Sequence, residues 1–418
     1  MTKKIFLGLA LMLILLVPTT VLSARAETAP PAPGDSDKFT FNAGGATFPY
    51  PLIDKWRVVY NADNPGIKLN YQAVGSGAGI KLFMSKKVDF AGSDAPLQAA
   101  DIAKLTPAVK YQSGGGYYGT PTTTAPTVAL HIPETMGAIV VVYNLPGIQK
   151  NGLYLTGDVI AKIFSGQIYY WHDDAIVKLQ KDPEIAKALK NDANKIIVVH
   201  RSDGSGTTFA FTSYLSQVSS TWKGQVGKGT SVPWPVGMGG SGNAGVATIV
   251  KKIPESIGYV ELAYAKNNMM ASLTGNGASV TGSGLIPMTY AFIQNHDKTA
   301  FLDATIETTA AAGAGAISSL PSPDGVWSNV SINDATGPKS YPIATFTYLL
   351  LNENLDQIPG MTQQKAQDLV HMLYWFVTDG QKYSEKLLYV PLPPAVQDLD
   401  KKGISMLKFN GQQLWKYP

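Results

Sequence analysis

The sequence predicts an α/β fold, in two domains or in one large domain with insertions, with helices packed on a largely parallel sheet. The chain has 418 residues, which is long for a single domain. Its residues are 45% hydrophobic and 15% charged, so they can fill sizeable cores. After the N-terminal segment, short apolar runs typical of strands alternate with amphipathic runs at helical spacing. This alternation is the pattern of a layered α/β protein.

The first 26 residues are typical of an export signal. Two lysines precede an apolar run at residues 5–17, and residues 24–26 have the small-x-small pattern of a cleavage site. We therefore expect an exported protein, in the periplasm or on the outer face of the cell membrane. Without cleavage, residues 5–23 are long enough to remain as a membrane anchor. Residues 27–37 are rich in Pro, Ala and acid, and we expect them to form a flexible linker.

Charge and cysteine content exclude several classes of protein. Residues 1–26 carry three basic residues and no acidic one, so their removal leaves 31 basic against 30 acidic residues. We do not expect such a nearly neutral chain to bind nucleic acid. The chain has no cysteine, which excludes disulfides, thiolate metal sites, cysteine nucleophiles and attachment of a lipid to an N-terminal cysteine.

Periodicity gives the order of the elements. Apolar residues at helical spacing between Leu52 and Tyr60 predict the first helix, with a proline near its first turn. A second helix is expected from about residue 80, and amphipathic patterns predict helices at 156–164 and 362–377. The turn-rich residues 113–127 are expected to form a surface excursion. Strands are expected at 39–42, 68–74, 88–91, 137–144, 196–199, 258–265 and 342–351.

Three loops share one design, in which a strand leads through glycine and a hydroxyl residue into a helix. They are residues 44–48 (GGATF), 75–79 (GSGAG) and 203–207 (DGSGT). Glycine lets the backbone approach a ligand closely, and the free N–H groups of a helix's first turn favour an anion. One such loop is most often a plain turn, but three in one chain indicate an anion site. Neither a P-loop nor a dinucleotide fingerprint is present, so a small anion fits better than a nucleotide.

Two charged residues refine this interpretation. Arg201 follows an apolar strand, at the end where open α/β sheets bind ligands, and a guanidinium binds an oxyanion through paired hydrogen bonds. The alternative is a surface ion pair with Asp203. An ionised Asp94 can only accept hydrogen bonds, so its presence implies a ligand that carries a proton, as phosphate does and sulfate does not. The alternative for Asp94 is a helix cap or a turn before Pro96.

Several segments of the chain resemble the phosphate-binding protein of the Pst-type ABC importer. They occur in the family's order between residues 42 and 265: NAGGATFPYPLIDKW, NYQAVGSGAGIK, VDFAGSDAPL, HRSDGSGTTFAFTSYL, GGSGNAGV and SIGYVELAYA. The resemblance implies a two-lobed periplasmic-binding-protein fold, in which hinge-linked α/β lobes with mixed, largely parallel sheets enclose phosphate. Lobe I would comprise residues 38–137 and 344–418, and lobe II residues 138–343. Residues 113–127 and 275–338 depart from the family's pattern and are interpreted as insertions.

The resemblance also implies ligand contacts and a partner. Asp94 would accept the phosphate proton, and Arg201, held by Asp203, would bind from the opposite lobe. A monomeric receptor would capture inorganic phosphate and deliver it to the membrane permease of an ABC importer, without a cofactor or a metal. The remaining phosphate contacts, from backbone N–H and hydroxyl groups, would be Thr47, Phe48, Ser76, Ser205, Gly206 and Thr207.

An enzyme is the main alternative function. Ser205 could act as a nucleophile with His200 as its base, but no GxSxG elbow is present. The five histidines show no HxH or HExxH spacing, which argues against a metallophosphatase. An adhesive surface protein would leave the three loops unexplained. Among receptors, the alternative ligand is another protonated oxyanion such as arsenate.

Overall fold

The computed structural model describes residues 28–105, 128–266 and 287–417. The predicted export signal and the stretch at 113–127 lie outside the described residues, as does the beginning of the stretch at 275–338. Among the described helices, none combines the length and the apolar character needed to cross a bilayer.

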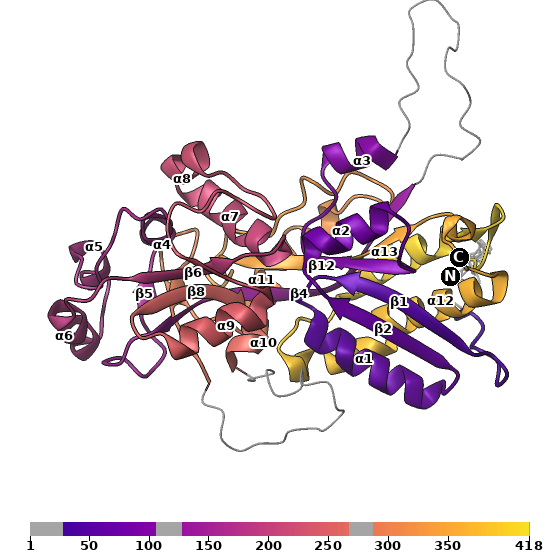
Figure 1. Cartoon of the computed structure of the whole chain (residues 1–418), viewed down its shortest axis with the longest axis horizontal. Coiled ribbons are helices and arrows are strands. Elements are labelled where there is room, and N and C mark those ends of the chain that lie inside the picture. The colour runs from indigo at the N-terminus through magenta and orange to yellow at the C-terminus, as the bar shows by residue number, and fades with distance from the viewer. Residues whose placement is uncertain (1–27, 106–127, 267–286, 418) are drawn as a thin grey trace, which may run out of the picture.

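A mixed sheet runs along the whole molecule and joins its two halves (Figure 1). The strand order is β2-β1-β3-β12-β4-β8-β6-β7, and β9 pairs with β4 beside this path. The strands are β1 Phe39–Gly45, β2 Ile67–Ala73, β3 Phe90–Ser93, β4 Ala129–Asn144, β6 Ile197–Arg201, β7 Met238–Gly240, β8 Ser256–Glu261, β9 Thr289–Tyr290 and β12 Ala344–Asn352.

Parallel pairing is confined to the two ends of this sheet. β1 is parallel to β2 and β3, and β6 is parallel to β7 and β8. β12 and β4 are antiparallel to their neighbours. The predicted α/β alternation therefore holds within each half, and the antiparallel pairs lie where the chain passes from one half to the other.

We call the two halves lobe I and lobe II, at the right and left of Figure 1. The long strand β4 runs through both, so the lobe boundary expected at residues 137 and 138 falls inside it. Lobe I contains the helices α1 Tyr50–Asp63, α2 Ser76–Met84, α3 Ala99–Leu105, α12 Gln363–Val377 and α13 Pro394–Ser405. Lobe II contains α4 Gly157–Phe164, α5 Asp174–Val177, α6 Pro183–Asn191, α7 Gly206–Val218, α8 Ser220–Gln225, α9 Gly242–Lys252 and α10 Leu262–Lys266.

The ladder between β4 and β12 contains a bulge where these strands pass between the lobes. Thr347 is opposite Thr135, but Tyr348 is opposite Pro133, so Glu134 is an extra residue on β4. Proline has no N–H to donate to the ladder, and a bulge redirects the side chain that it carries. The Glu134 side chain thereby reaches Thr347 on β12.

Large aromatic side chains fill the core of each lobe. In lobe I, Trp56 of α1 stacks on Phe376 of α12 with ring centroids 4.8 Å apart, and its Nε1–H donates to a backbone carbonyl at 2.7 Å. In lobe II, Phe211 of α7 stacks on Tyr259 of β8 at 4.2 Å. These contacts fix α1 and α7, whose N-terminal ends lie at the site described below.

Some element boundaries differ from the prediction. The strand expected at 258–265 ends at Glu261, whose Oε1 accepts the Ala263 N–H at 2.8 Å and starts the helix α10. The helix α2 begins at Ser76 instead of about residue 80, because Gly75 adopts a φ of 91° and turns the chain directly into the helix. The described part of the stretch at 275–338 contains β9, β10 Phe292–Gln294, β11 Phe301–Leu302 and α11 Ile306–Ala314.

Residues 28–37, predicted to form a flexible linker, contain no helix or strand. The Thr28 carbonyl accepts a hydrogen bond from Trp415 Nε1 at 2.9 Å, and Gln364 Nε2 donates to Asp37 at 3.2 Å. Pro30 is buried. This segment therefore contacts the C-terminal part of lobe I at both of its ends.

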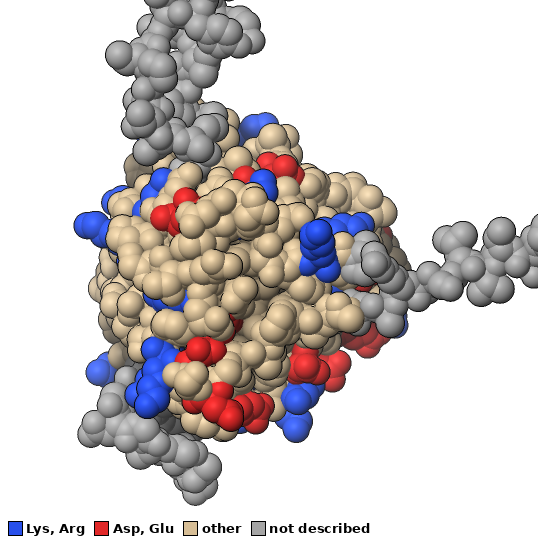
Figure 2. Space-filling view, turned by 90° about the vertical axis from the view of Figure 1, so that its right-hand side faces the viewer, with Lys and Arg blue, Asp and Glu red and all other residues tan. Residues whose placement is uncertain are grey.

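Figure 2 shows the end of lobe I, where basic and acidic side chains lie mostly near the margin. Neither sign forms a continuous patch across this face. The face therefore lacks the basic stripe that nucleic-acid-binding proteins use to contact phosphates.

Candidate functional site

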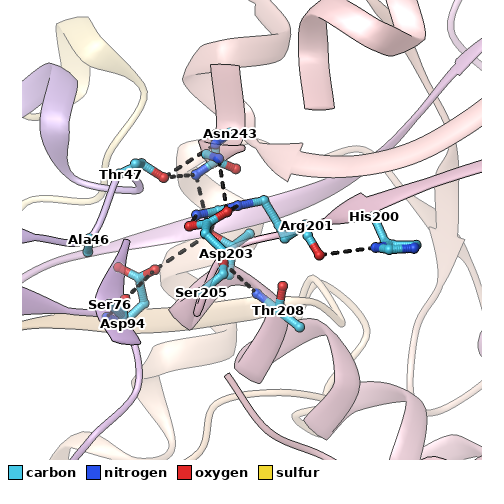
Figure 3. Close-up of polar contacts among 12 residues, drawn as sticks. Ala46, Thr47, Ser76, Asp94, His200, Arg201, Asp203, Ser205, Thr208 and Asn243 are labelled. Atoms are coloured by element: carbon cyan, nitrogen blue, oxygen red, sulfur yellow. Dashed lines mark hydrogen bonds and ion pairs between the residues drawn. The ribbon is translucent and has the colours of Figure 1, made fainter. Parts of the chain in front are cut away.

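The candidate site lies where the two lobes touch (Figure 3). Lobe I contributes the loop after β1, the start of α2 and the residue after β3, and lobe II contributes the end of β6 and the start of α7. These segments lie at the carboxyl ends of parallel strands, the edge at which open α/β sheets bind ligands. The Gly77 N–H donates to the Gly204 carbonyl at 2.8 Å, so the lobes are in direct backbone contact. The structure is a closed conformation.

Thr47 links the two lobes. Its Oγ1 accepts hydrogen bonds from the Asn243 backbone N–H at 3.3 Å and from Asn243 Nδ2 at 3.0 Å, and its carbonyl accepts the Tyr264 hydroxyl at 2.6 Å. The neighbouring Phe48 is fully buried; its ring packs on Tyr389, and its carbonyl accepts the Tyr389 hydroxyl at 2.7 Å. These contacts fix the loop, and with it the direction of the Thr47 and Phe48 N–H groups.

Ser76, Asp94 and Gly206 are packed against one another. Ser76 Oγ accepts the Asp94 N–H at 3.2 Å and lies 3.5 Å from Asp94 Oδ2. A Cβ at Gly206 would be 2.5 Å from both Asp94 Cβ and Ser76 Oγ. Any side chain at Gly206 would therefore push α7 of lobe II away from lobe I.

Arg201 is held in a fixed orientation by Asp203. Its Nε donates to Asp203 Oδ1 at 2.7 Å and its Nη2 donates to Oδ2, the paired geometry of a guanidinium and a carboxylate. Burial raises the pKa of Asp203, but the hydrogen bonds and charge of Arg201, with the Gly242 N–H, outweigh burial and lower this pKa overall. Arg201 is 3% exposed, and its Nη1 reaches Thr207 Oγ1 at 3.4 Å.

Asn243 is a site residue that was not predicted. It is fully buried in the first turn of α9, and its Nδ2 donates to Thr47 Oγ1 and, at 3.3 Å, to Thr207 Oγ1. Its Oδ1 accepts the Glu261 N–H at 3.0 Å. The segment GGSGNAGV around Asn243 is another glycine-rich turn that leads into a helix, and this pattern is the signal that could have identified it.

Ser205 has a different local role from its neighbours. Its Oγ caps α7 by accepting the Thr208 N–H at 3.1 Å. His200, the base of the enzyme alternative, stacks on Trp234, and its Nδ1 lies 3.0 Å from the Arg201 carbonyl. Figure 3 shows the His200 ring pointing away from Ser205, so the structure does not bring these two side chains together.

Several backbone N–H groups at this junction have no acceptor among the described residues. The first N–H groups of a helix have no partner within the helix, and buried N–H groups normally find one elsewhere. Helix N-termini also favour negative charge. The hydrogen bonds within the described residues leave unused the N–H groups of Thr47, Phe48, Ser76, Gly206 and Thr207. N–H groups without an acceptor at the start of a helix are available to donate hydrogen bonds to an anion.

Asp94 is the carboxylate among these donors. It is 1% exposed, and burial raises its pKa to about 7, although the hydrogen bond from Thr347 and the charge of Arg201 act in the opposite direction. The Thr207 hydroxyl lies 3.5 Å from its Oδ2. Thr347 Oγ1 lies 3.0 Å from its Oδ1 and 3.1 Å from Glu134 Oε1. Neither Thr347 nor Glu134 was predicted, since Thr347 is 253 residues from Asp94 in the chain.

Among the described residues, the junction offers many hydrogen-bond donors and the carboxylate of Asp94, which is not paired with a cation. Arg201 is already paired with Asp203. An anion that donates one hydrogen bond to Asp94 would therefore fit this arrangement. The structure brings Thr47, Ser76, Asp94 and Arg201 into one network through Thr207 and Asn243. In the described ranges, no group of His, Cys, Asp or Glu side chains has the arrangement of a metal site.

The raised pKa of Asp94 predicts a pH-dependent cost to stability. In the ligand-free protein, the folded carboxyl keeps its proton up to about pH 7 while the unfolded one ionises near 3.8, so stability falls as the pH rises between these values. At about 1.4 kcal/mol per pKa unit, the full cost is about 4 kcal/mol. We expect Asp94→Asn to raise the melting temperature in ligand-free buffer, more at pH about 8 than at pH about 5. Equal effects at both pH values would contradict this, and Asp63→Asn, at an exposed aspartate, is the control.

Comparison with known proteins places the chain in a family. Residues 30–363 match the sequence profile of the PBP superfamily domain. The chain is 37% identical over 373 residues to the phosphate-binding protein PstS of Xylella fastidiosa, covering 88% of this chain and 85% of that protein. It is 35% identical to PstS of Pasteurella multocida over 418 residues, which covers 100% of both chains. The fold is similar to that of a phosphate-binding protein from Stenotrophomonas maltophilia, with a TM-score of 0.55 and 18% identity over 87% of this chain and 93% of that chain. The chain, with its two-lobed α/β fold and buried loop junction, is therefore a member of the PstS family within the PBP superfamily.

Proposed function

We propose that this protein captures inorganic phosphate between its two lobes and delivers it to the permease of an ABC importer. The observation that carries this proposal is the buried carboxylate of Asp94 among hydrogen-bond donors for an anion. Membership of the PstS family supports the same function. A carboxylate in an anion site repels a fully ionised ligand but accepts a hydrogen bond from one that keeps a proton.

Each site residue has a defined task in this proposal. Asp94 accepts the proton of phosphate, and Arg201, oriented by Asp203, supplies the positive charge from lobe II. Asn243 positions the hydroxyls of Thr47 and Thr207. The other contacts are donated by backbone N–H and hydroxyl groups of Thr47, Phe48, Ser76, Ser205, Gly206 and Thr207, with the Ser205 hydroxyl also used to cap α7.

Closure of the lobes supplies the binding free energy. Phosphate enters between open lobes, and closure brings the donors of lobe II against Asp94 and Ser76 of lobe I. Charge-assisted hydrogen bonds contribute about 1.5–3 kcal/mol each, and exclusion of water strengthens them. This gain offsets the lost hydration of the anion. The permease would recognise the closed arrangement of the lobes.

The remaining parts of the proposal concern the setting of the protein. The N-terminal export pattern supports a location outside the cytoplasm, either free after cleavage or held by an uncleaved segment. A receptor that presents both lobes to a permease can act as a monomer and needs no cofactor. The arrangement of Ser205 and His200 does not favour hydrolysis, because the Ser205 hydroxyl accepts a hydrogen bond and His200 contacts a backbone carbonyl.

Asp94→Asn tests the proposed selectivity. The amide introduced by this substitution would donate a hydrogen bond where the carboxylate accepts one, so phosphate binding should weaken and sulfate binding should strengthen. We expect the ratio of the sulfate Kd to the phosphate Kd to fall by at least about 100-fold, as measured by titration calorimetry. Equal binding of sulfate and phosphate by the unmodified protein would overturn the role given to Asp94.

Gly206→Ala tests the proposed closure. The added methyl would meet Asp94 Cβ and Ser76 Oγ, so the closed state should be destabilised and the phosphate Kd should rise by about ten-fold or more. Gly224→Ala is the matched control, since a Cβ at Gly224 of α8 meets no heavy atom within 4 Å. If both variants bound phosphate with the same Kd, the contact at Gly206 would not belong to the bound state.

A further inference from the structure

A second buried carboxyl lies behind Asp94, away from the donors of lobe II. Glu134 is fully buried at the bulge of β4, and its Oε1 lies 3.1 Å from Thr347 Oγ1. The same hydroxyl lies 3.0 Å from Asp94 Oδ1. The three groups therefore form a line that leads from the strand ladder between the lobes to the ligand site.

When both carboxyls are ionised, the three groups have too few hydrogens to form both hydrogen bonds. The Thr347 hydroxyl has one hydrogen and can donate it to only one carboxylate. The Thr347 oxygen and the oxygen of the other carboxylate, about 3 Å apart, would then face each other with no hydrogen between them. Glu134 Oε2 is also buried and has no hydrogen-bond partner among the described residues. A proton on Glu134 resolves the conflict, because Glu134 then donates to Thr347, and Thr347 donates to Asp94.

The groups around Glu134 favour this arrangement. Burial raises the pKa of Glu134 to about 8; the hydrogen bond with Thr347 acts in the opposite direction, and the negative charge of Asp94 raises this pKa further. The positive charge of Arg201 lowers the pKa of Asp94 and so favours the ionised form of Asp94. The Gln381 side chain donates to the Glu134 backbone carbonyl at 3.0 Å and leaves the carboxyl untouched. The other titratable groups that interact with Glu134 or Asp94 are Tyr71, Tyr264, Tyr348, Tyr389 and Glu261.

We propose that Glu134 is a specificity-determining positioning residue, which retains a proton and acts through Thr347 to keep Asp94 an acceptor for the protonated ligand. This inference rests on the proposed function of the site as a phosphate receptor. Glu134 does not touch the ligand. Its proton sets the direction of the hydrogen bonds from Glu134 to Thr347 to Asp94, so that the free oxygen of Asp94 accepts from the ligand.

The arrangement couples ligand binding to a proton on Glu134. Above the pKa of Glu134, the free protein loses this proton, but a bound phosphate beside ionised Asp94 favours its return. Phosphate binding at alkaline pH should therefore take up about one proton, and the Kd should rise by up to about ten-fold per pH unit.

Glu134→Gln provides the direct test, because the glutamine amide donates to Thr347 at every pH. In calorimetric titrations with inorganic phosphate at pH about 9, in two buffers of different ionisation enthalpy, we expect uptake of about one proton by the unmodified protein and none by Glu134→Gln. The ratio of the Kd values at pH about 9.5 and about 7.5 should be large for the unmodified protein and close to one for the variant. Equal proton uptake by the two proteins would overturn the proposal.

Thr347→Val is the second test and does not depend on titration of Glu134. This variant is nearly the same size but has no hydroxyl, so Asp94 loses its donor and should keep its own proton more readily. The ratio of the sulfate Kd to the phosphate Kd should then fall by at least about ten-fold, and Thr347→Ser should restore this ratio. Unchanged discrimination in Thr347→Val would contradict the proposal. Failure of the unmodified protein to bind phosphate would instead contradict the proposed function.

Discussion

The rest of the site depends on one constraint, which is that a buried carboxylate needs a hydrogen-bond donor. Asp94 lies at the end of β3, is almost wholly removed from water, and sits within reach of hydroxyl groups from both lobes. In an anion site such a group excludes ligands that only accept hydrogen bonds. Arg201 does not cancel its effect, because that guanidinium is already paired with Asp203. In the proposed function, selectivity and affinity therefore come from different groups in the same cluster.

The fold explains how these groups come together. The carboxyl ends of β1, β3 and β6 place three loops at one junction, and the strands β4 and β12 connect the lobes behind it. Glycine at position 206 lets α7 approach Asp94 closely enough for the two lobes to share hydrogen bonds. Burial of Asp94 raises its pKa, because the ionised carboxylate is less favourable there than in water. The bulge at Glu134 adds a second carboxyl, which is linked to the first through the Thr347 hydroxyl.

The sequence predicted the α/β class and most of the residues that the structure brings together at this junction, for identifiable reasons. Strand-to-helix loops carry local signals, so the glycine-rich turns at Thr47, Ser76 and Gly206 could be found, and Arg201 and Asp94 followed from their position after strands. Family resemblance supplied the two-lobed arrangement. Asn243 lies in a turn of the same type but was not predicted as a site residue, because its amide side chain is uncharged.

Other features could not be read from the sequence because they depend on distant pairing. The contact of Thr347 with Asp94 and Glu134 requires the register of β12 against β3 and β4, and no local pattern encodes a bulge at Pro133 and Glu134. The helix α10 was predicted as strand, since its residues are apolar and aromatic, and only the contact between Glu261 and the Ala263 N–H starts the helix. Tertiary contacts decided each of these cases over local propensity.

The central claim is that a phosphate ion held between the lobes donates a hydrogen bond to Asp94. A high-resolution crystal structure of the protein crystallised with phosphate tests this claim most directly. The account predicts a phosphate enclosed by the backbone donors at Thr47, Ser76 and Gly206, with one phosphate oxygen at the short distance of about 2.5–2.7 Å from Asp94. A phosphate bound away from this junction, or an Asp94 side chain turned away from the ion, would contradict the account.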